Sequence, residues 1–412
     1  MNGRGSGPRS SRLRTGAGLL AAAVAVTLAA GCASSASGGS GGSGSSAKGP
    51  IIIGGLAGTT GAYAAAGTAT INGAKLAIQQ INAKGGLLGR QVKFVWYNDA
   101  FSSTLDTQYF EHLVSQGAVG ISGSPSEGPT AAALASRYKL PVIGDVGAGG
   151  TTIYPKGPGT DPLPWAFSNS PSTFAMAQEE SKFAAAHCDS IGIFYGNDTY
   201  SPSENTIFKQ TFAAAGKAGA IKVDQEVTEN LTTGATVPLA SEVAALKSSG
   251  AQCVYIGLDP EDDGSFVVNM HNAGVQPKYV IGGDTMLATD TYPKLAGSLA
   301  NGTYSVAEQA TVAPNALAKK FVSDYQSQFN LAPVIYGYAA YDGVMMLAQA
   351  IKKAGSTKNT DILAQLNKMT GFPGVMGTLS LSTKNHTTDS TSTQMMVQYS
   401  TATKTWAPVP SS

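Results

Sequence analysis

The stretch "PIIIGGLAGTTGAYAAAGTATINGAKLAIQQINAKGGLLGRQVKFVWYND", residues 50–99, decides the fold. Its first part, 50–58, is an apolar run that ends in glycine and predicts a buried strand. Apolar residues then recur at the spacing of one helix face through 69–86, where a glycine pair ends the predicted helix. Residues 91–99 predict a second strand. A strand, a helix and a strand in this order are typical of parallel strands joined by a crossover helix.

The same alternation continues along the chain and restarts after residue 170. We therefore expect two doubly wound α/β units, at about 50–168 and about 169–300. The segments after residue 300 are too short for a third domain and are expected to pack onto these units. Ser201-Pro202-Ser203-Glu204 predicts a capping box at a helix start, with Ser201 as the cap. The further predicted strands are 118–122, 140–145, 190–196, 220–227, 251–258, 278–284, 377–382 and 394–400, and the further helices are 104–117, 129–139, 171–186, 201–215, 238–248, 263–273, 315–329, 336–355 and 359–369.

The N-terminus predicts export. Arginines but no acids precede an apolar segment that is too short to span a membrane, so we interpret residues 1–31 as a signal peptide. Leu28-Ala29-Ala30-Gly31-Cys32 resembles a bacterial lipobox, which implies that Cys32 carries a lipid and becomes the mature N-terminus. The alternative is an ordinary signal peptide cut near an A-x-A site. Residues 32–48 are rich in glycine and serine and predict a flexible tether. We therefore expect a protein anchored by lipid to the outer face of the bacterial cell membrane.

Charge and cysteine content narrow the function classes. The chain has 27 basic and 26 acidic residues, and removing residues 1–31, which hold four arginines, leaves a net charge of −3. This balance argues against a nucleic-acid-binding protein. The roughly 365 residues after the tether exceed one ordinary core and predict two lobes. Cys188 and Cys253 are the cysteines besides Cys32, and such a pair in an exported protein suggests a disulfide.

Polar residues follow the predicted strands. In open parallel sheets, ligands bind beyond the carboxyl ends of the strands. In the first unit these ends carry hydroxyls and glycine amides, which suit a carboxylate. In the second unit they carry acids and tyrosines, which suit an ammonium group with an apolar body, so a zwitterion would satisfy both. The competing interpretation is that these residues only cap helices and form turns.

Other chemistries are poorly supported. Gly55-x-x-Gly58-x-x-Gly61 departs from the dinucleotide pattern, and Ser124-Pro125-Ser126-Glu127-Gly128 lacks the first glycine of a hydrolase elbow. The four histidines have no metal-ligand spacing, so we expect no metal, no cofactor and no enzyme activity. Residues 259–264 resemble a calcium loop, but its twelfth position is Met270, so we interpret the segment as a solvated acidic turn. The aromatic segment 336–347 reads as core, with Tyr336 or Tyr338 reaching the cleft.

The motifs N-G-A-x-L-A-I, I-N-A-x-G-G-L-L-G-R and Y-N-D in residues 72–99 resemble the leucine/isoleucine/valine-binding protein family. "GIFYGNDTYSPSENTIFKQTFAAAG", "YVIGGDTM" and "YAAYDGVMMLAQAIKKAGS" are similar to later segments of that family, whose members bind substrates for ATP-driven amino-acid importers. The resemblance implies a type I periplasmic-binding-protein fold with two lobes joined by three crossing segments. These crossings are expected near 166–170, 302–308 and 373–378. The implied N-terminal lobe is 49–168 plus 306–375, and the C-terminal lobe is 169–305 plus 376–412.

The resemblance also implies a ligand site. Thr59, Thr60, Tyr63 and Ser126 match residues that hold the ligand carboxylate in the family. Tyr200 matches a tyrosine that closes over the ligand, and Asp284 matches an acid that pairs with its ammonium group. The chain departs from the family at Glu127, where a serine is expected, and in the turn containing Asp145, Gly147 and Ala148, where a threonine is missing. With Asp198 and Asp259 from the strand ends, these residues complete the expected site.

In this fold the strands at 190–196 and 251–258 are neighbours in a 2-1-3 order, which places Cys188 and Cys253 at the same end of the sheet. We expect a substrate-binding lipoprotein, acting as a monomer, that closes on a small ligand and delivers it to a membrane permease. An amino acid of the branched-chain type is the first expectation for the ligand. An amide, an amine, a polyol or a small organic acid remains the alternative, because Glu127 and Asp145 add acid to the first lobe. A ligand sensor for a receptor is the other functional class.

Overall fold

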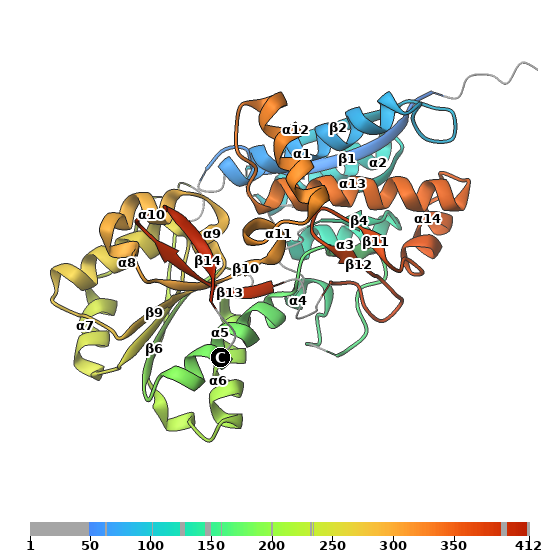
Figure 1. Cartoon of the computed structure of the whole chain (residues 1–412). Coiled ribbons are helices and arrows are strands. Elements are labelled where there is room, and N and C mark those ends of the chain that lie inside the picture. The colour runs from blue at the N-terminus through green and yellow to red at the C-terminus, as the bar shows by residue number, and fades with distance from the viewer. Residues whose placement is uncertain are drawn as a thin grey trace, which may run out of the picture. The chain divides into compact units, whose positions relative to one another are not determined.

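The computed structural model describes residues 49–61, 64–100, 102–123, 128–144, 150–157, 159–198, 201–230, 233, 235–388 and 394–409. All of them belong to the unit of residues 47–412, whose elements are labelled in Figure 1. None of the helices in this described part is long and apolar enough to cross a membrane.

The first sheet is parallel and has the order β2-β1-β3-β4-β5. Alternate residues of β1 face opposite helical layers, because side chains of a strand point to the two faces in turn. Ile51 and Ile53 pack in the core that α1 shares with α13, whereas Leu56 packs in a second core with residues of α2 and α3. The strands are β1 (Ile51–Ala57), β2 (Val92–Asn98), β3 (Ala118–Ser122), β4 (Val142–Ile143) and β5 (Ala166–Phe167), and the helices are α1 (Ala64–Ala83), α2 (Ser103–Ser115), α3 (Gly128–Tyr138), α4 (Gly150–Ile153), α12 (Ala316–Phe329), α13 (Ile335–Ala354) and α14 (Asn359–Leu366).

The second sheet has the order β14-β13-β10-β9-β8-β6-β7. Its strands from β7 to β10 are parallel, and β13 and β14 add an antiparallel edge. Val254 and Ile256 of β8 pack against residues of α7 and α8, and Tyr255 packs on the other face against Phe208 of α6. The strands are β6 (Ile191–Gly196), β7 (Ile221–Val227), β8 (Cys253–Gly257), β9 (Tyr279–Gly282), β10 (Tyr304–Glu308), β13 (Gln394–Ser400) and β14 (Thr405–Pro408), and the helices are α5 (Thr173–His187), α6 (Ser201–Ala214), η2 (Ala218–Ala220), α7 (Ala240–Ser249), α8 (Pro260–Asn272), α9 (Thr285–Ala288), α10 (Thr291–Ala296), η3 (Gly297–Ala300) and α11 (Gln309–Val312).

The predicted fold class is confirmed, since both sheets are parallel in their centres and covered by helices on both faces. The 2-1-3 order of their first strands is also confirmed. The strands expected at 140–145 and 377–382 contain only two strand residues each. Short elements such as β5, β14 and α9–α11 were not predicted, because segments of two to six residues are too short to show a periodic pattern.

One of the three crossing segments expected from the sequence differs in the structure. At 372–379, where the third crossing is expected, β11 (Phe372–Pro373) and β12 (Thr378–Leu379) form a separate hairpin. The segment that forms a hydrogen bond with 166–170 is instead the one around residue 386. Ser168 donates its backbone N–H to the carbonyl oxygen of His386 at 2.8 Å. The lobe boundaries derived from the resemblance remain a prediction.

The capping box predicted at Ser201 is wrong. Ser201 is the first residue of α6, and it donates its backbone N–H to Asp198 Oδ1 at 2.8 Å and its hydroxyl to Asp198 Oδ2. Glu204 does not serve the helix start, because its carboxyl group is buried and accepts a hydrogen bond from Tyr255. Glu204 therefore binds Tyr255, which is distant in sequence, rather than the helix start that the local pattern predicted.

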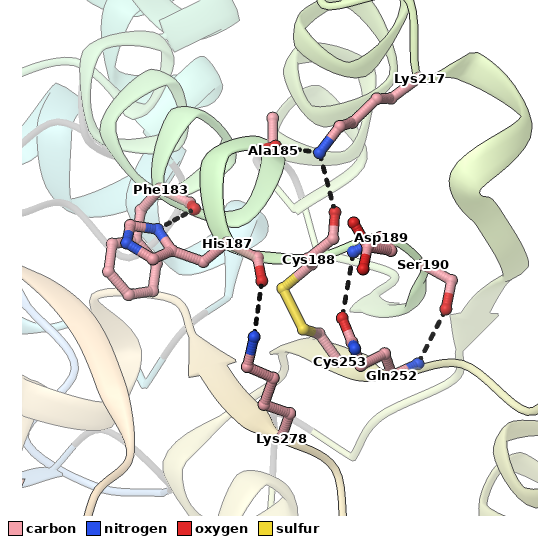
Figure 2. The surroundings of a disulfide bond; sticks show 10 residues. All are labelled: Phe183, Ala185, His187, Cys188, Asp189, Ser190, Lys217, Gln252, Cys253 and Lys278. Carbon is pink, nitrogen blue, oxygen red and sulfur yellow. Dashed lines mark hydrogen bonds between the residues drawn. A yellow bond between two sulfur atoms is a disulfide. The ribbon is translucent and has the colours of Figure 1, made fainter.

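A disulfide joins Cys188, the residue that follows α5, to Cys253, the first residue of β8 (Figure 2). Both cysteines are fully buried. Lys217 donates from Nζ to the carbonyl oxygens of Ala185 and Cys188, at 2.7 and 3.2 Å, and so holds the end of α5 against the same corner. The bond lies at the amino end of β8, opposite the carboxyl ends of the strands.

Replacing both Cys188 and Cys253 with alanine is expected to lower the free energy of unfolding by about 2–4 kcal/mol, because the bond restricts the unfolded chain. Urea unfolding of the purified protein measures this loss. Ligand affinity should stay unchanged, since the bond lies at the other end of the strands. Equal unfolding midpoints for the wild type and the double variant would show that the bond adds no stability.

Candidate functional site

Three acids gather where neighbouring strands of the second sheet end. Asp198 follows β6, Asp259 follows β8, and Asp284 follows β9. The carboxyl ends of parallel neighbours meet at one edge of the sheet, which brings together residues that are far apart in sequence. All three were predicted from the sequence as ligand-binding residues.

Helix starts hold two of these carboxylates in place. Asp198 accepts the backbone N–H of Ser201 at the beginning of α6. Asp259 caps α8 and accepts the backbone N–H of Asp262 at 2.8 Å. The positive end of a helix favours a carboxylate at this position.

Asp284 lines a cavity of about 470 Å³. The pKa of its carboxyl group is raised to about 6, chiefly by burial and also by the negative charge of Asp198, while a hydrogen bond from the backbone of Thr285 opposes the rise. Tyr336 lines the same cavity, whereas Tyr338 is buried in the core between α1 and α13, so Tyr336 is the tyrosine that reaches a cavity. The other lining residues are Leu287, Glu308, Thr311, Val312, Pro333, Val334, Ile335, Thr405 and Trp406.

A buried layer of carboxyl groups lies beneath the strand ends. The hydroxyl of Tyr255 donates to Glu204 Oε2 at 2.9 Å, and Glu180 is 1% exposed. Burial, followed by the charges of Glu204 and Asp284, raises the pKa of Glu180 well above its ordinary value. Burial and the charge of Asp284 do the same for the pKa of Glu204. Burial thus favours the protonated form of both glutamates, and neither was predicted as part of the site.

The acidic segment after β8 is not a solvated turn, and that prediction is wrong. Asp259 is 2% exposed, and Asp262 and Asp263 are fully buried. Asp263 accepts the backbone N–H of Leu258 at 3.2 Å and the hydroxyl of Thr285 at 3.3 Å. Glu229, which sequence reasoning missed, accepts the backbone N–H of Asp259, and burial raises the pKa of Glu229 to about 8. No signal in the sequence connected Glu229 with residues thirty positions later.

At the end of the first sheet, Asn98 holds the turn that contains Thr59 and Thr60. Thr59 donates its backbone N–H to Asn98 Oδ1 at 2.9 Å, and Asn98 Nδ2 donates to Thr60 Oγ1 at 3.2 Å. The pairing of Ala57 with Asn98 in the β1–β2 register places these residues side by side. Asn98 is the middle residue of the Y-N-D motif and was not named as a site residue, although the motif could have indicated it.

Most other predicted site residues fall outside the described part of the chain, and their roles remain predictions. They are Tyr63, Ser126, Glu127, Asp145, Gly147, Ala148 and Tyr200, together with the lipidation residue Cys32.

The described arrangement suits a ligand with a positive group. Among the described residues, no ion pair involves Asp259 or Asp284. A carboxylate beside an apolar wall of Leu287, Val334 and Trp406 can bind an ammonium group that carries an apolar body.

Comparisons with known proteins agree with this architecture. The family model described as periplasmic binding protein matches residues 50–404. Leu/Ile/Val-binding protein homolog 3 of Brucella melitensis is 26% identical over 328 residues, which cover 78% of this chain and 83% of the relative.

Two solved structures share the fold. A periplasmic binding protein type 1 from Bordetella pertussis Tohama I has a TM-score of 0.78 at 20% identity, covering 88% of this chain and 100% of that chain. The branched-chain amino acid transporter substrate binding protein LivJ from Streptococcus pneumoniae, solved in complex with isoleucine, has a TM-score of 0.71 at 20% identity, covering 87% of this chain and 99% of that chain.

Proposed function

The chain belongs to the periplasmic binding protein family, and from this premise we propose that it is the extracytoplasmic substrate-binding lipoprotein of an ABC transporter. It binds a small ligand between two lobes and delivers it to a membrane permease. Cys32 anchors it to the outer face of the membrane, and the segment 32–48 serves as a tether. The lobes are those derived from the resemblance, with the ligand between the carboxyl ends of their strands.

The ligand is an amino acid of the branched-chain type. The observation that supports this most is the cavity beside Asp284, whose lining combines the acids Asp284 and Glu308 with apolar side chains such as Leu287 and Val334. The carboxylate pairs with the ammonium group, and Leu287, Val334 and Ile335 pack against an aliphatic side chain. On the first sheet, the turn held by Asn98 presents the Thr60 hydroxyl and backbone N–H groups to the ligand carboxylate.

The relatives support the same ligand class. The Brucella relative is named as a Leu/Ile/Val-binding protein homolog, and the Streptococcus structure contains isoleucine. Glu127 and Asp145 depart from the family pattern, so an amine, an amide, a polyol or a small organic acid is the alternative ligand. A role as ligand sensor for a receptor is the alternative function.

A thermal-shift screen of the purified protein against amino acids, amides, amines, polyols and small organic acids tests this proposal. A ligand that binds the folded state adds about 2.7 kcal/mol of stability at a concentration of one hundred times its Kd. We expect leucine, isoleucine or valine to raise the melting temperature, and we expect this rise to be lost in Asp284→Asn. A rise with amides, amines or polyols and none with any amino acid would contradict the proposed ligand.

A further inference from the structure

Three acids of the second unit bring carboxylate oxygens to one point. Glu229 lies two residues after β7, Asp259 caps α8, and Asp262 is in the first turn of α8. One carboxylate oxygen from each of the three lies within 4.8 Å of the others. The acids come from two separate chain segments, so the arrangement differs from the continuous calcium loop that the sequence excluded.

Backbone N–H groups already hold one oxygen of each side chain. Glu229 Oε1 accepts from Asp259, Asp259 Oδ1 accepts from Asp262, and Asp262 Oδ1 accepts from Val237 at 2.8 Å. These bonds set the direction of the three carboxylates before any ligand arrives. The geometry is therefore preorganised by the backbone.

The second oxygen of each side chain is buried and has no hydrogen-bond partner among the described residues. These atoms are Glu229 Oε2, Asp259 Oδ2 and Asp262 Oδ2. Asp259 is 2% exposed and Asp262 is fully buried. A buried carboxylate oxygen without a partner is costly, and three together repel one another. Partnerless oxygens on three acids whose carboxylates converge favour a positively charged ligand between them.

The distances and the oxygen ligands fit a metal ion. Calcium binds oxygen at about 2.4 Å, so two oxygens on one ion lie at most about 4.8 Å apart, and one oxygen from each of the three acids lies within that separation of the others. Carboxylate oxygens suit Ca²⁺ and Mg²⁺, whereas Zn²⁺ prefers nitrogen and sulfur. Calcium tolerates an irregular set of ligands, and the positions of these side chains are imposed by the backbone.

We propose that Glu229, Asp259 and Asp262 bind one divalent cation, with Ca²⁺ preferred over Mg²⁺. The ion links the segment after β7 to the start of α8. Gly196 leaves the space that Glu229 occupies, because a Cβ at residue 196 would lie 1.8 Å from Glu229 Oε2. The cation site shares Asp259 with the predicted ligand-binding residues but not Asp284, and its test contains no amino acid.

The test compares the purified full chain after EDTA treatment with the same protein in CaCl₂ or MgCl₂, by thermal unfolding and titration calorimetry. Calcium should raise the melting temperature in a saturable way and titrate with one site per chain. In Asp262→Asn, the oxygen that accepts from Val237 is kept and the charge is lost, so calcium affinity should fall at least tenfold. Glu226→Gln, an exposed residue on β7, is the matched control and should respond as the wild type does.

Melting temperatures measured in EDTA distinguish the loss of cation binding from a general loss of stability in the variants. Without the ion, Asp262→Asn and Asp259→Asn should melt at or above the wild type, because each removes a repelling charge while asparagine still accepts the backbone N–H. No calcium response in the wild type would overturn the proposal. An undiminished response in both variants would also overturn it, as would a response to organic amines but not to either metal.

Discussion

An Asp284→Asn variant is expected to bind leucine, isoleucine or valine about 100-fold more weakly than the wild type. Asparagine keeps the shape of the side chain but removes the charge that pairs with the ligand ammonium. A charge-assisted bond in a partly desolvated site contributes about 2–4 kcal/mol, and each 1.4 kcal/mol is a factor of ten in affinity. Titration calorimetry at pH 7.5 measures the difference.

Asp290→Asn is the matched control for this experiment. Asp290, the exposed residue just before α10, forms an ion pair with Lys294. Removing the charge of Asp290 should therefore leave ligand affinity unchanged. Equal affinities for Asp284→Asn and the wild type would mean that Asp284 does not contact the ligand. The cavity beside it would then not be the ligand site.

The same carboxylate should make binding depend on pH. The pKa of Asp284 is raised to about 6, chiefly by burial. Below pH 6 the empty site takes up a proton that must leave before an ammonium group can pair with the carboxylate. Affinity should therefore be flat from pH 8 to 7 and fall toward tenfold per unit below pH 6. The Asp284→Asn variant should lack this fall, and an equal wild-type affinity at pH 5 and 7.5 would contradict the pairing.

A Gly73→Ala variant is expected to lower the free energy of unfolding by about 2 kcal/mol. Gly73 lies where α1 crosses α13, and a Cβ there would lie 2.0 Å from the carbonyl oxygen of Gly337. The helices would have to separate and lose packing along their shared core, which typically costs about 1–3 kcal/mol and sometimes more. The better helix propensity of alanine returns at most about 1 kcal/mol. Urea unfolding followed by circular dichroism measures the net effect.

Gly219→Ala is the control for this variant. No atom lies within 4 Å of a Cβ placed at Gly219, so this change should leave stability within about 0.5 kcal/mol of the wild type. If Gly73→Ala unfolded at the same urea concentration as Gly219→Ala, the close approach of α1 and α13 would not limit stability.

The motifs of residues 72–99 were recognisable in the sequence, and the structure gives each a physical role. Gly73 allows two helices to approach, and Asn82 exchanges two hydrogen bonds of 2.8 Å with the backbone of Val92 at the start of β2. Asn98 holds the turn of Thr59 and Thr60. The contacts of Asn82 and Asn98 are local or join neighbouring strands, so their pattern is readable along the chain, whereas the partner of Gly73, Gly337, lies in a distant helix.

The sequence by itself determined the order of strands and helices, the two parallel sheets, and the gathering of Asp198, Asp259 and Asp284. Periodicity and strand topology depend on residues that are close in the chain or on rules common to all parallel sheets. Only the tertiary structure decided which acids are buried. It placed Glu204 against Tyr255 rather than at a helix cap, and it brought Glu229 to Asp259 and Asp262. Burial depends on what packs above a residue from elsewhere in the chain, and no local pattern contains that information.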